Sequence, residues 1–541
     1  MFLKRNHIDI IILASVPLII TFPFFLSNSL IASQDILFHF VWSEQFHKVL
    51  TEGVLYPQWV DTPSGYGSPT FIFYAPLSFY VISIINTLTK SIVMSINLAV
   101  HLSFFLSGMS MYFFARKLNG EKAGLISGIL YQLIPFHIFD LYERGVIPEL
   151  FAFAWFPLIL LSMRKMFVDR EPSSLAYTGL AYAGLIITHL VSSFMFTFIM
   201  VGYGVYLSLS EKKKGILRLL CAILLGLGLS SIYLIPVIFE RTFVHIEFIK
   251  FHYYRDYFLL LLRHLIDGGF YTILHGILIM EAAFLIFSFL LLKKKFIDAR
   301  NVFFIFLLFM SLFLTTPLSS LLWKHVPEFS NLQFPWRWLT FSGLSVSILA
   351  GNMIGNFKGE LKKASILILL PLLILSLIMI PLIIQVSFFI DKEIDNWRTH
   401  SNIFSPREYR PIWIKDYNKM LPPTEKVTIL SGNGSIDIIE WESNKRLLST
   451  DGNTDLRLKL STFYYPGWTA RIDGIYSGII VERETGSMLI EVPEGRHKVE
   501  FIFEDTPVRY YGKVVSVISL IVLFLVYLYG MRVFPQKYLK Q

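Results

Sequence analysis

Asp35 is the residue best placed to do chemistry in this sequence, because it closely follows an apolar run over 9–27 that is long enough to cross a membrane. A carboxylate at the membrane surface can act as general base towards an acceptor hydroxyl. His39 follows four residues later, on the same helical face, as an orienting partner or a second ligand. The alternative is a helix cap beside a solvated histidine. Glu44 and Tyr66, further along the same segment, are secondary candidates.

A second group of charges lies in the short segment Asp140-Leu141-Tyr142-Glu143-Arg144-Gly145, followed by Pro148-Glu149. Charged side chains beside a bilayer are costly unless they are paired or functional. Arg144 could bind a phosphate with two hydrogen bonds, with Glu143 or Glu149 binding sugar hydroxyls. A structural Arg–Glu pair explains the same residues equally well.

The third group is Gln333-Phe334-Pro335-Trp336-Arg337-Trp338. Arg337 between two tryptophans is typical of an anchor in the aromatic belt of a membrane protein. It is equally typical of a ligand for a headgroup phosphate, with Trp336 as a stacking surface for a sugar. His189 and Glu240, near predicted outer helix ends, are weaker candidates, and for His189 a packing role is favoured. Glu281 lies within a predicted span, where an ionisable residue suggests a function.

The composition shows which class of protein must position these residues. Of 541 residues, 54% are hydrophobic and 16% are charged, whereas soluble domains average about 25% charged. The mean hydropathy is +0.58, which indicates a polytopic α-helical membrane protein. The single cysteine, Cys221, excludes an intrachain disulfide framework and a zinc site built from cysteines.

The apolar runs predict about twelve transmembrane helices. They cover 9–27, 92–115, 123–139, 150–166, 174–191, 193–209, 216–238, 276–292, 302–320, 338–355, 364–386 and 511–531. With the N-terminus inside, the basic clusters around Arg116, Arg164, Lys213, Lys294, Lys362 and Arg532 all fall on cytoplasmic loops.

This arrangement requires that 71–90 does not cross the membrane, so we predict an interfacial helix there. The net charge of +9 is therefore an orientation signal, and no nucleic-acid partner is expected. We predict a transmembrane domain over 1–386, with a catalytic outer loop over 28–70, and a final transmembrane helix with a basic cytoplasmic tail over 510–541.

The region 387–509 differs in composition and is predicted to be an extracytoplasmic β-sandwich. Alternating patterns predict strands over 426–431, 435–442, 445–450, 456–463, 468–473, 478–483, 487–492 and 497–504. Asn433-Gly434 is predicted to form a hairpin turn between the first two strands, and Asp473-Gly474 is a further turn signal.

Several motifs resemble known membrane families. They are Gly53 to Pro57 with Trp59, Gly65-Tyr66-Gly67-Ser68-Pro69, Phe73-Tyr74-Ala75-Pro76-Leu77, Arg144-Gly145 with Glu149, Gln333 to Arg337, and Tyr464-Tyr465-Pro466-Gly467-Trp468. Together with the early Asp35, they resemble the GT-C glycosyltransferases. The similarity is closer to YfhO-like membrane proteins, some of which are labelled 6-pyruvoyl-tetrahydropterin synthase-related.

The resemblance implies a glycosyltransferase at the plasma membrane, with both termini cytoplasmic, that moves a sugar from a polyprenyl-phosphate donor to an extracytoplasmic acceptor by an inverting displacement. Asp35 would be the catalytic base, and Arg144 and Arg337 would stabilise the departing lipid phosphate. The resemblance implies no particular cofactor. A divalent cation remains an option, although Ile36 stands where a second acidic residue would support it.

The pterin label implies no pterin chemistry, because the sequence contains no His-x-His pair and Cys221 lies within a predicted span. Two other classes of function stay open. One is a flippase or transporter for lipid-linked sugars or polymers, which would need more polar residues in mid-membrane. The other is a non-catalytic membrane scaffold whose β domain binds glycan.

Overall fold

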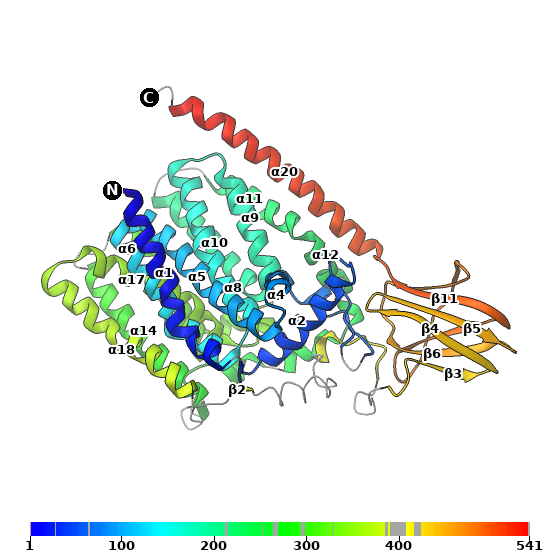
Figure 1. The fold of residues 1–541 in the computed structure, drawn as a ribbon. Coiled ribbons are helices and arrows are strands. Elements are labelled where there is room, and N and C mark those ends of the chain that lie inside the picture. The colour runs from blue at the N-terminus through cyan, green and yellow to red at the C-terminus, as the bar shows by residue number, and fades with distance from the viewer. Residues whose placement is uncertain are drawn as a thin grey trace.

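The computed structural model consists of a helical bundle joined to a β domain (Figure 1). The structure describes residues 2–27, 29–62, 65–210, 215–251, 253–261, 263–264, 269–293, 298–326, 328–384, 388–389, 407–415 and 423–538.

The helices of the bundle follow the apolar runs. They are α1 (Phe2–Ser27), α2 (Ile36–Thr51), α3 (Thr70–Phe73), α4 (Leu77–Thr89), α5 (Ile92–Asn119), α6 (Glu121–Leu133), α7 (Pro135–Phe139), α8 (Ile147–Arg164), α9 (Ser174–Thr188), α10 (Leu190–Ser210), α11 (Ile216–Leu229), α12 (Ser231–Glu240), α14 (Phe270–Lys293), α15 (Val302–Leu314), α16 (Ser320–His325), α17 (Leu339–Asn356), α18 (Gly359–Ile384) and α20 (Pro507–Tyr538). Short helical turns relevant to the site are η1 (Asp140–Arg144), η9 (Pro335–Trp338) and η11 (Arg407–Tyr409).

Among the described residues, the candidate spans come close to the predicted twelve without reaching it. Within the described part of the chain, nine helical segments are long and apolar enough to cross a membrane, or up to eleven if each of two bent pairs is one span. The pair α11 and α12 bends by 74°, and the pair that contains α15 and α16 bends by 93°. The remaining predicted span, 174–191, is the 15-residue helix α9, about 22 Å long and so shorter than a hydrocarbon core of about 30 Å.

The segment 71–90 contains the four-residue helix α3 and the 13-residue helix α4. At 1.5 Å per residue, α4 is about 20 Å long, which is too short to cross a bilayer. It packs against α2 and α5. The prediction that this segment does not span is in keeping with its length.

Several of the basic loops meet at one end of the bundle. Lys117 forms an ion pair with Asp169 at 2.9 Å, and the side chains of Asn119 and Asn301 exchange two hydrogen bonds of 3.0 Å. Asn356 donates to the Asn119 carbonyl at 3.1 Å. Both chain termini lie at the side of the bundle away from the β domain (Figure 1). These contacts hold the loops that follow α5, α8, α14 and α17 together at one end of the bundle; that this end is cytoplasmic stays a prediction.

The β domain is built from two antiparallel sheets, as its alternating sequence predicts. Its strands are β3 (Val427–Ser431), β4 (Gly434–Glu442), β5 (Lys445–Gly452), β6 (Leu456–Phe463), β7 (Trp468–Ile472), β8 (Ile475–Ser477), β9 (Ile480–Val481), β10 (Ser487–Val492) and β11 (Gly495–Phe503). One sheet has the order β3-β6-β10-β9 and the other β4-β5-β11-β7-β8. The predicted strand 478–483 is replaced by the short strands β8 and β9.

The predicted hairpin at Asn433-Gly434 is wrong. β3 pairs with β6 and β4 pairs with β5, so this turn carries the chain from one sheet to the other. The left-handed conformation falls on Gly432, with φ of 97°. The hairpin between β4 and β5 instead pairs Glu442 with Lys445. Asp473-Gly474 does form a hairpin turn, between β7 and β8, with φ of 52° and 83°.

The loop between α2 and α3 joins the bundle to the β domain. Trp59 is fully buried in the core of the β domain, with ring centroids 5.6 Å from Trp468 and 5.4 Å from Phe503. Tyr66 stacks on Phe463 at 4.8 Å. The loop therefore contributes to the β-domain core, which fixes the position of the neighbouring α2.

A second connection uses a short antiparallel pair. β1 (Leu30–Ile31) pairs with β2 (Phe388–Phe389), so the start of the first loop lies beside the chain that leaves α18.

Candidate active site

Asp35 lies half-buried at the N-terminus of α2. Its backbone N–H donates to the Arg144 carbonyl at 2.8 Å, and that of Gln34 donates to the Glu143 carbonyl at 3.1 Å. These two bonds hold the start of α2 against η1, which precedes α8. The first two groups of predicted site residues are therefore joined through the backbone.

Arg144 is held between two carboxylates. Its Nη1 forms ion pairs with Asp140 and with Glu149, the latter at 2.7 Å, and all three side chains are buried. The guanidinium also lies 4.8 Å from the ring centroid of Trp336. A π-helical turn places Asp140 and Arg144 on one face. The interpretation of Arg144 as part of an Arg–Glu pair agrees with these contacts.

Arg337 approaches the same group of charges from η9. It is 8% exposed, and its Nη1 donates to the Leu332 carbonyl at 2.8 Å. Among the described residues, the buried Nε of Arg337 has no hydrogen-bond partner. The charge of Arg337 interacts with those of Arg144 and Glu149 and also with Asp35. The Nε–H of Arg337 is therefore able to donate a hydrogen bond to a ligand.

Two buried tyrosines interact electrostatically with Asp35 and Arg337. Burial raises the pKa of the Tyr74 hydroxyl well above its ordinary value; the charge of Asp35 adds to this, and Arg337 opposes it. Burial also raises the pKa of Tyr409, with a further contribution from Glu408. The rings of Tyr74 and Tyr409 lie 6.3 Å apart. Both phenols therefore stay neutral, as hydrogen-bond donors beside Asp35.

His39 occupies an aromatic environment on the first turns of α2. Its ring lies 5.8 Å from Tyr74, 5.9 Å from Phe79 and 6.0 Å from Trp42. Burial, with contributions from His189 and Arg144, lowers the pKa of His39 to about 3. The imidazole is therefore neutral at physiological pH. It can offer a hydrogen bond to a ligand but no positive charge.

His189 lies at the C-terminal end of α9, where Nδ1 contacts the Ser192 hydroxyl at 2.7 Å. Its charge interacts with that of Glu149, so it borders the cluster. Glu143 is half-buried and joins through its backbone.

The remaining candidates lie elsewhere. Glu44 lines a separate cavity, and Tyr66 packs on the β domain. Glu240 forms a buried ion pair with Arg509 at 2.9 Å and accepts from the Tyr465 hydroxyl at 3.1 Å. Glu240 therefore fixes α12 to α20 and to the β domain.

An apolar groove of about 460 Å³ lies between α4, α5 and α8. Its lining includes Leu77 of α4, Leu102 and Phe113 of α5, and Phe151 and Leu158 of α8. Phe151 follows Glu149 by two residues, and Leu77 follows Tyr74 by three. The groove lining therefore begins on the same turn of α8 as Glu149 and continues about 10 Å along that helix.

Sequence reasoning missed three members of the cluster. Asp140 was visible as one of several charges near a predicted bilayer surface, but nothing distinguished it from its neighbours. Tyr74 stands within a recognised motif without a role. Tyr409 comes from a part of the chain about 370 residues from Asp35, and no local pattern connects the two.

In the described ranges, no group of three or more His, Cys, Asp or Glu side chains is arranged to hold a metal ion. Cys221 is exposed on α11.

A family model matches residues 71–390, and its description is "6-pyruvoyl-tetrahydropterin synthase related domain; membrane protein". The chain belongs to this family. This pterin-synthase-related family consists of membrane proteins, so the family suggested by the sequence motifs is confirmed, as is the multi-pass membrane architecture.

Among the relatives of this pterin-synthase-related protein is an uncharacterized protein of Lactococcus lactis subsp. cremoris. It is 27% identical over 248 residues, which are 44% of this chain and 40% of the relative. The chain thus spans about two fifths of that relative's length.

Two solved structures with a similar arrangement each have a TM-score below 0.5. ArnT from Cupriavidus metallidurans, bound to undecaprenyl phosphate, has a TM-score of 0.46 at 15% identity, covering 66% of this chain and 62% of ArnT. The Archaeoglobus fulgidus oligosaccharyltransferase in the apo form has a TM-score of 0.42 at 11% identity, covering 75% of this chain and 60% of that one.

Proposed function

We propose that this protein is a membrane glycosyltransferase that moves a sugar from a polyprenyl-phosphate donor to an extracytoplasmic acceptor. The observation that carries the proposal is a half-buried carboxylate, Asp35, whose charge interacts with that of the buried Arg337, in a bundle that also contains an apolar groove between α4, α5 and α8. A lipid-linked sugar has parts that match these features: a hydroxyl-rich sugar, an anionic phosphate and a long apolar chain.

In the proposed reaction, the Asp35 carboxylate takes the proton of the acceptor hydroxyl as general base. The acceptor oxygen attacks the anomeric carbon from the face opposite the phosphate, and a new C–O bond forms. The bond between that carbon and the phosphate oxygen breaks, and its electron pair leaves on the lipid phosphate. One displacement inverts the configuration of the anomeric carbon.

Arg337 is the proposed phosphate ligand, because its Nε has no partner among the described residues while Arg144 is already held by two carboxylates. A fixed cation beside the leaving phosphate stabilises the charge that develops in the transition state. Arg144 would act as a positioning residue, since its backbone carbonyl accepts from the Asp35 N–H. Trp336, which packs on Arg144 and is buried against Phe334, would help to hold Arg144 in place.

The groove between α4, α5 and α8 would hold the isoprenoid chain of the donor. By the positive-inside rule, the basic loops at the end of the bundle away from the β domain would face the cytoplasm. The β domain would then face the extracytoplasmic side.

The test separates donor binding from chemistry in protein reconstituted into proteoliposomes with radiolabelled undecaprenyl-phosphate hexoses. Asp35→Asn is expected to bind donor and to lose transfer. Ala154→Trp fills the groove and is expected to lose donor binding. Leu180→Trp, at a 49% exposed position on α9, is the matched control.

The proposal fails if Asp35→Asn transfers at the wild-type rate, or if Ala154→Trp binds donor as Leu180→Trp does. Movement of labelled donor across the bilayer without release of undecaprenyl phosphate would instead support a flippase.

A further inference from the structure

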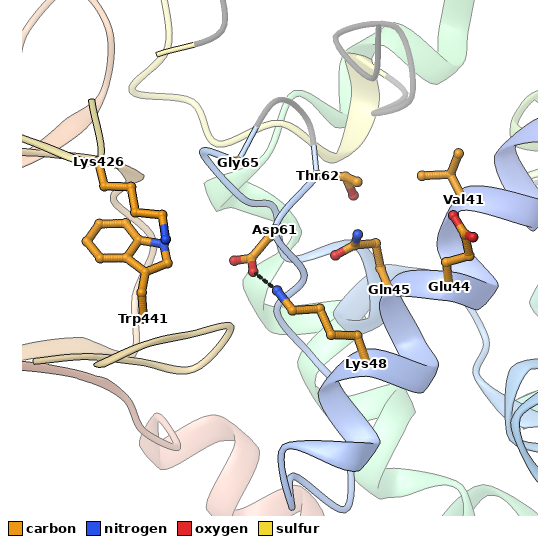
Figure 2. A pocket seen from close by; sticks show the side chains of 9 residues that line it. All are labelled: Val41, Glu44, Gln45, Lys48, Asp61, Thr62, Gly65, Lys426 and Trp441. Atoms are coloured by element: carbon orange, nitrogen blue, oxygen red, sulfur yellow. Dashed lines mark hydrogen bonds and ion pairs between the residues drawn. The ribbon is translucent and has the colours of Figure 1, made fainter. Parts of the chain in front are cut away.

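A polar cavity of about 550 Å³ lies at the seam between α2 and the β domain (Figure 2). One wall is formed by α2 with Glu44, Gln45 and Lys48, and the opposite wall by Trp441 and Lys426 of the β domain. Its volume falls within the range of roughly 300–1,000 Å³ that is typical of small-molecule sites. None of the residues that line this cavity belongs to the charged cluster around Asp35, Arg144 and Arg337.

The cavity contains polar atoms that a ligand could satisfy. Thr62 is 4% exposed, and its hydroxyl has no hydrogen-bond partner among the described residues. The same holds for the buried Oε1 of Gln45. Buried polar groups are normally hydrogen-bonded, so unpartnered ones that line a cavity suggest a ligand that both donates and accepts.

The charges of the cavity are balanced. Lys48 forms an ion pair with Asp61 at 2.6 Å, and Asp61 also pairs with the buried Arg446 at 2.9 Å. Two lining carboxylates, on Glu44 and Asp61, therefore face two lining ammonium groups, on Lys48 and Lys426. Such a mixed wall favours a neutral ligand with many hydroxyl groups over an anion or a cation.

Trp441 gives the cavity an aromatic surface. The ammonium group of Lys426 lies 5.5 Å from the ring centroid (Figure 2), and Lys426 is exposed, so it can move aside. The ring of a sugar combines C–H groups, which pack on an aromatic face, with hydroxyls that donate and accept hydrogen bonds. An indole opposite a wall of amide, hydroxyl and carboxylate groups matches both properties.

We propose that this cavity binds a neutral saccharide, as the site for the acceptor glycan. Its use for an acceptor rests on the proposed transferase function, whereas the binding itself does not. Glu44 follows Asp35 by nine residues along α2, or about 14 Å of helix. A short oligosaccharide is long enough to match this separation along the helix axis.

The test is saturation-transfer NMR on the full-length protein in nanodiscs, with methyl β-glucoside, maltose and diacetylchitobiose as probes. At least one probe is expected to receive saturation from the wild type. Trp441→Ala should reduce that signal at least fivefold. Tyr476→Ala is the matched control, because Tyr476 is also an aromatic residue of the same sheet with a cation, Arg471, 4.6 Å from its ring, and it lies outside the cavity.

Thr62→Val guards against an unfolded variant, because it replaces an unpartnered hydroxyl by a methyl group of similar size and should weaken binding without loss of thermal stability. The inference is overturned if no probe receives saturation, or if both cavity variants bind as the control does. Asp35→Asn should bind the probe like the wild type. Wild-type protein that binds a probe but transfers no sugar would sink the transferase proposal and leave the saccharide site standing.

Discussion

Gly67→Ala tests the contact between the first loop and the β domain. Gly67 has φ of 87°, a left-handed conformation that side chains disfavour, and an added Cβ would lie 2.5 Å from the ring of Trp59. Trp59 is fully buried in the β-domain core. The substitution must therefore both strain the backbone and displace a core tryptophan.

Gly65→Ala is the matched control, because Gly65 has a similar φ of 83° and no atom within 4 Å of an added Cβ. Both variants incur a backbone cost of about 1–2 kcal/mol. Overpacking a core costs typically 1–3 kcal/mol more, and only Gly67→Ala incurs it. The difference between the two variants thus isolates the contact with Trp59.

Thermal unfolding, followed by tryptophan fluorescence in detergent, measures this difference. Each kcal/mol lowers the midpoint of a unit the size of the β domain by about 4–8 °C. We expect Gly67→Ala to unfold at least about 4 °C below Gly65→Ala. Equal midpoints for the two variants would refute the placement of Trp59 beside Gly67.

Three further predictions concern the buried ion pairs that fix the β domain. Asp61→Asn leaves the buried Arg446 without its ion-pair partner and should lower the free energy of unfolding by about 3–5 kcal/mol. Lys48→Met, at an exposed position, should lower it by only about 0–1 kcal/mol. Similar losses for the two variants in chemical denaturation would contradict this prediction. Burial raises the pKa of Asp61, but Arg446 and Lys48 outweigh it and hold that pKa below 3.8. Ionised Asp61 therefore stabilises the fold above about pH 4, and this contribution is lost as the pH falls through the lowered pKa. The difference in thermal midpoint between wild type and Asp61→Asn should therefore narrow from pH 6 to pH 3. A constant difference would count against the ion pair. Glu240→Ala leaves the buried Arg509 without its ion-pair partner and should lower the free energy of unfolding by about 3–5 kcal/mol. The β domain should then become sensitive to limited proteolysis. Protease resistance equal to that of the wild type would argue against the role of Glu240 in fixing the β domain.

The helices and strands that the sequence predicted correctly are those whose pattern of apolar residues is uninterrupted. Long apolar runs and alternating strands follow directly from burial in lipid and in a half-exposed sheet. The bends at α11–α12 and α15–α16 were missed, because the composition stays apolar across both breaks. Pro317, at the first turn after the second bend, was the available signal, since proline is favoured where a helix begins.

The turn at Asn433-Gly434 was misassigned for a related reason. The dipeptide favours a tight turn, but it does not determine whether the two strands beside it pair with each other. Here β3 pairs with β6 and β4 pairs with β5, so the two strands lie in different sheets. Pairing over this distance is a tertiary property and leaves no local signature.

The part of the candidate site that could be predicted is the part that depends only on which end of each predicted span a residue occupies. Asp35, Arg144 and Arg337 were placed at one end of the bundle by span counting, and their charges do interact. The ion pairs that hold Arg144, and the contact of Tyr409 with Tyr74, depend on side-chain packing, so only the structure reveals them.

The most direct test of the account is the rate of glycosyl transfer by Asp35→Asn in proteoliposomes that contain a donor the wild type uses. General base catalysis contributes about 10²–10⁴-fold. Asp35→Asn is expected to bind the polyprenyl-phosphate sugar with unchanged affinity and to transfer it at least about 100-fold more slowly than wild type. Transfer at the wild-type rate would contradict it.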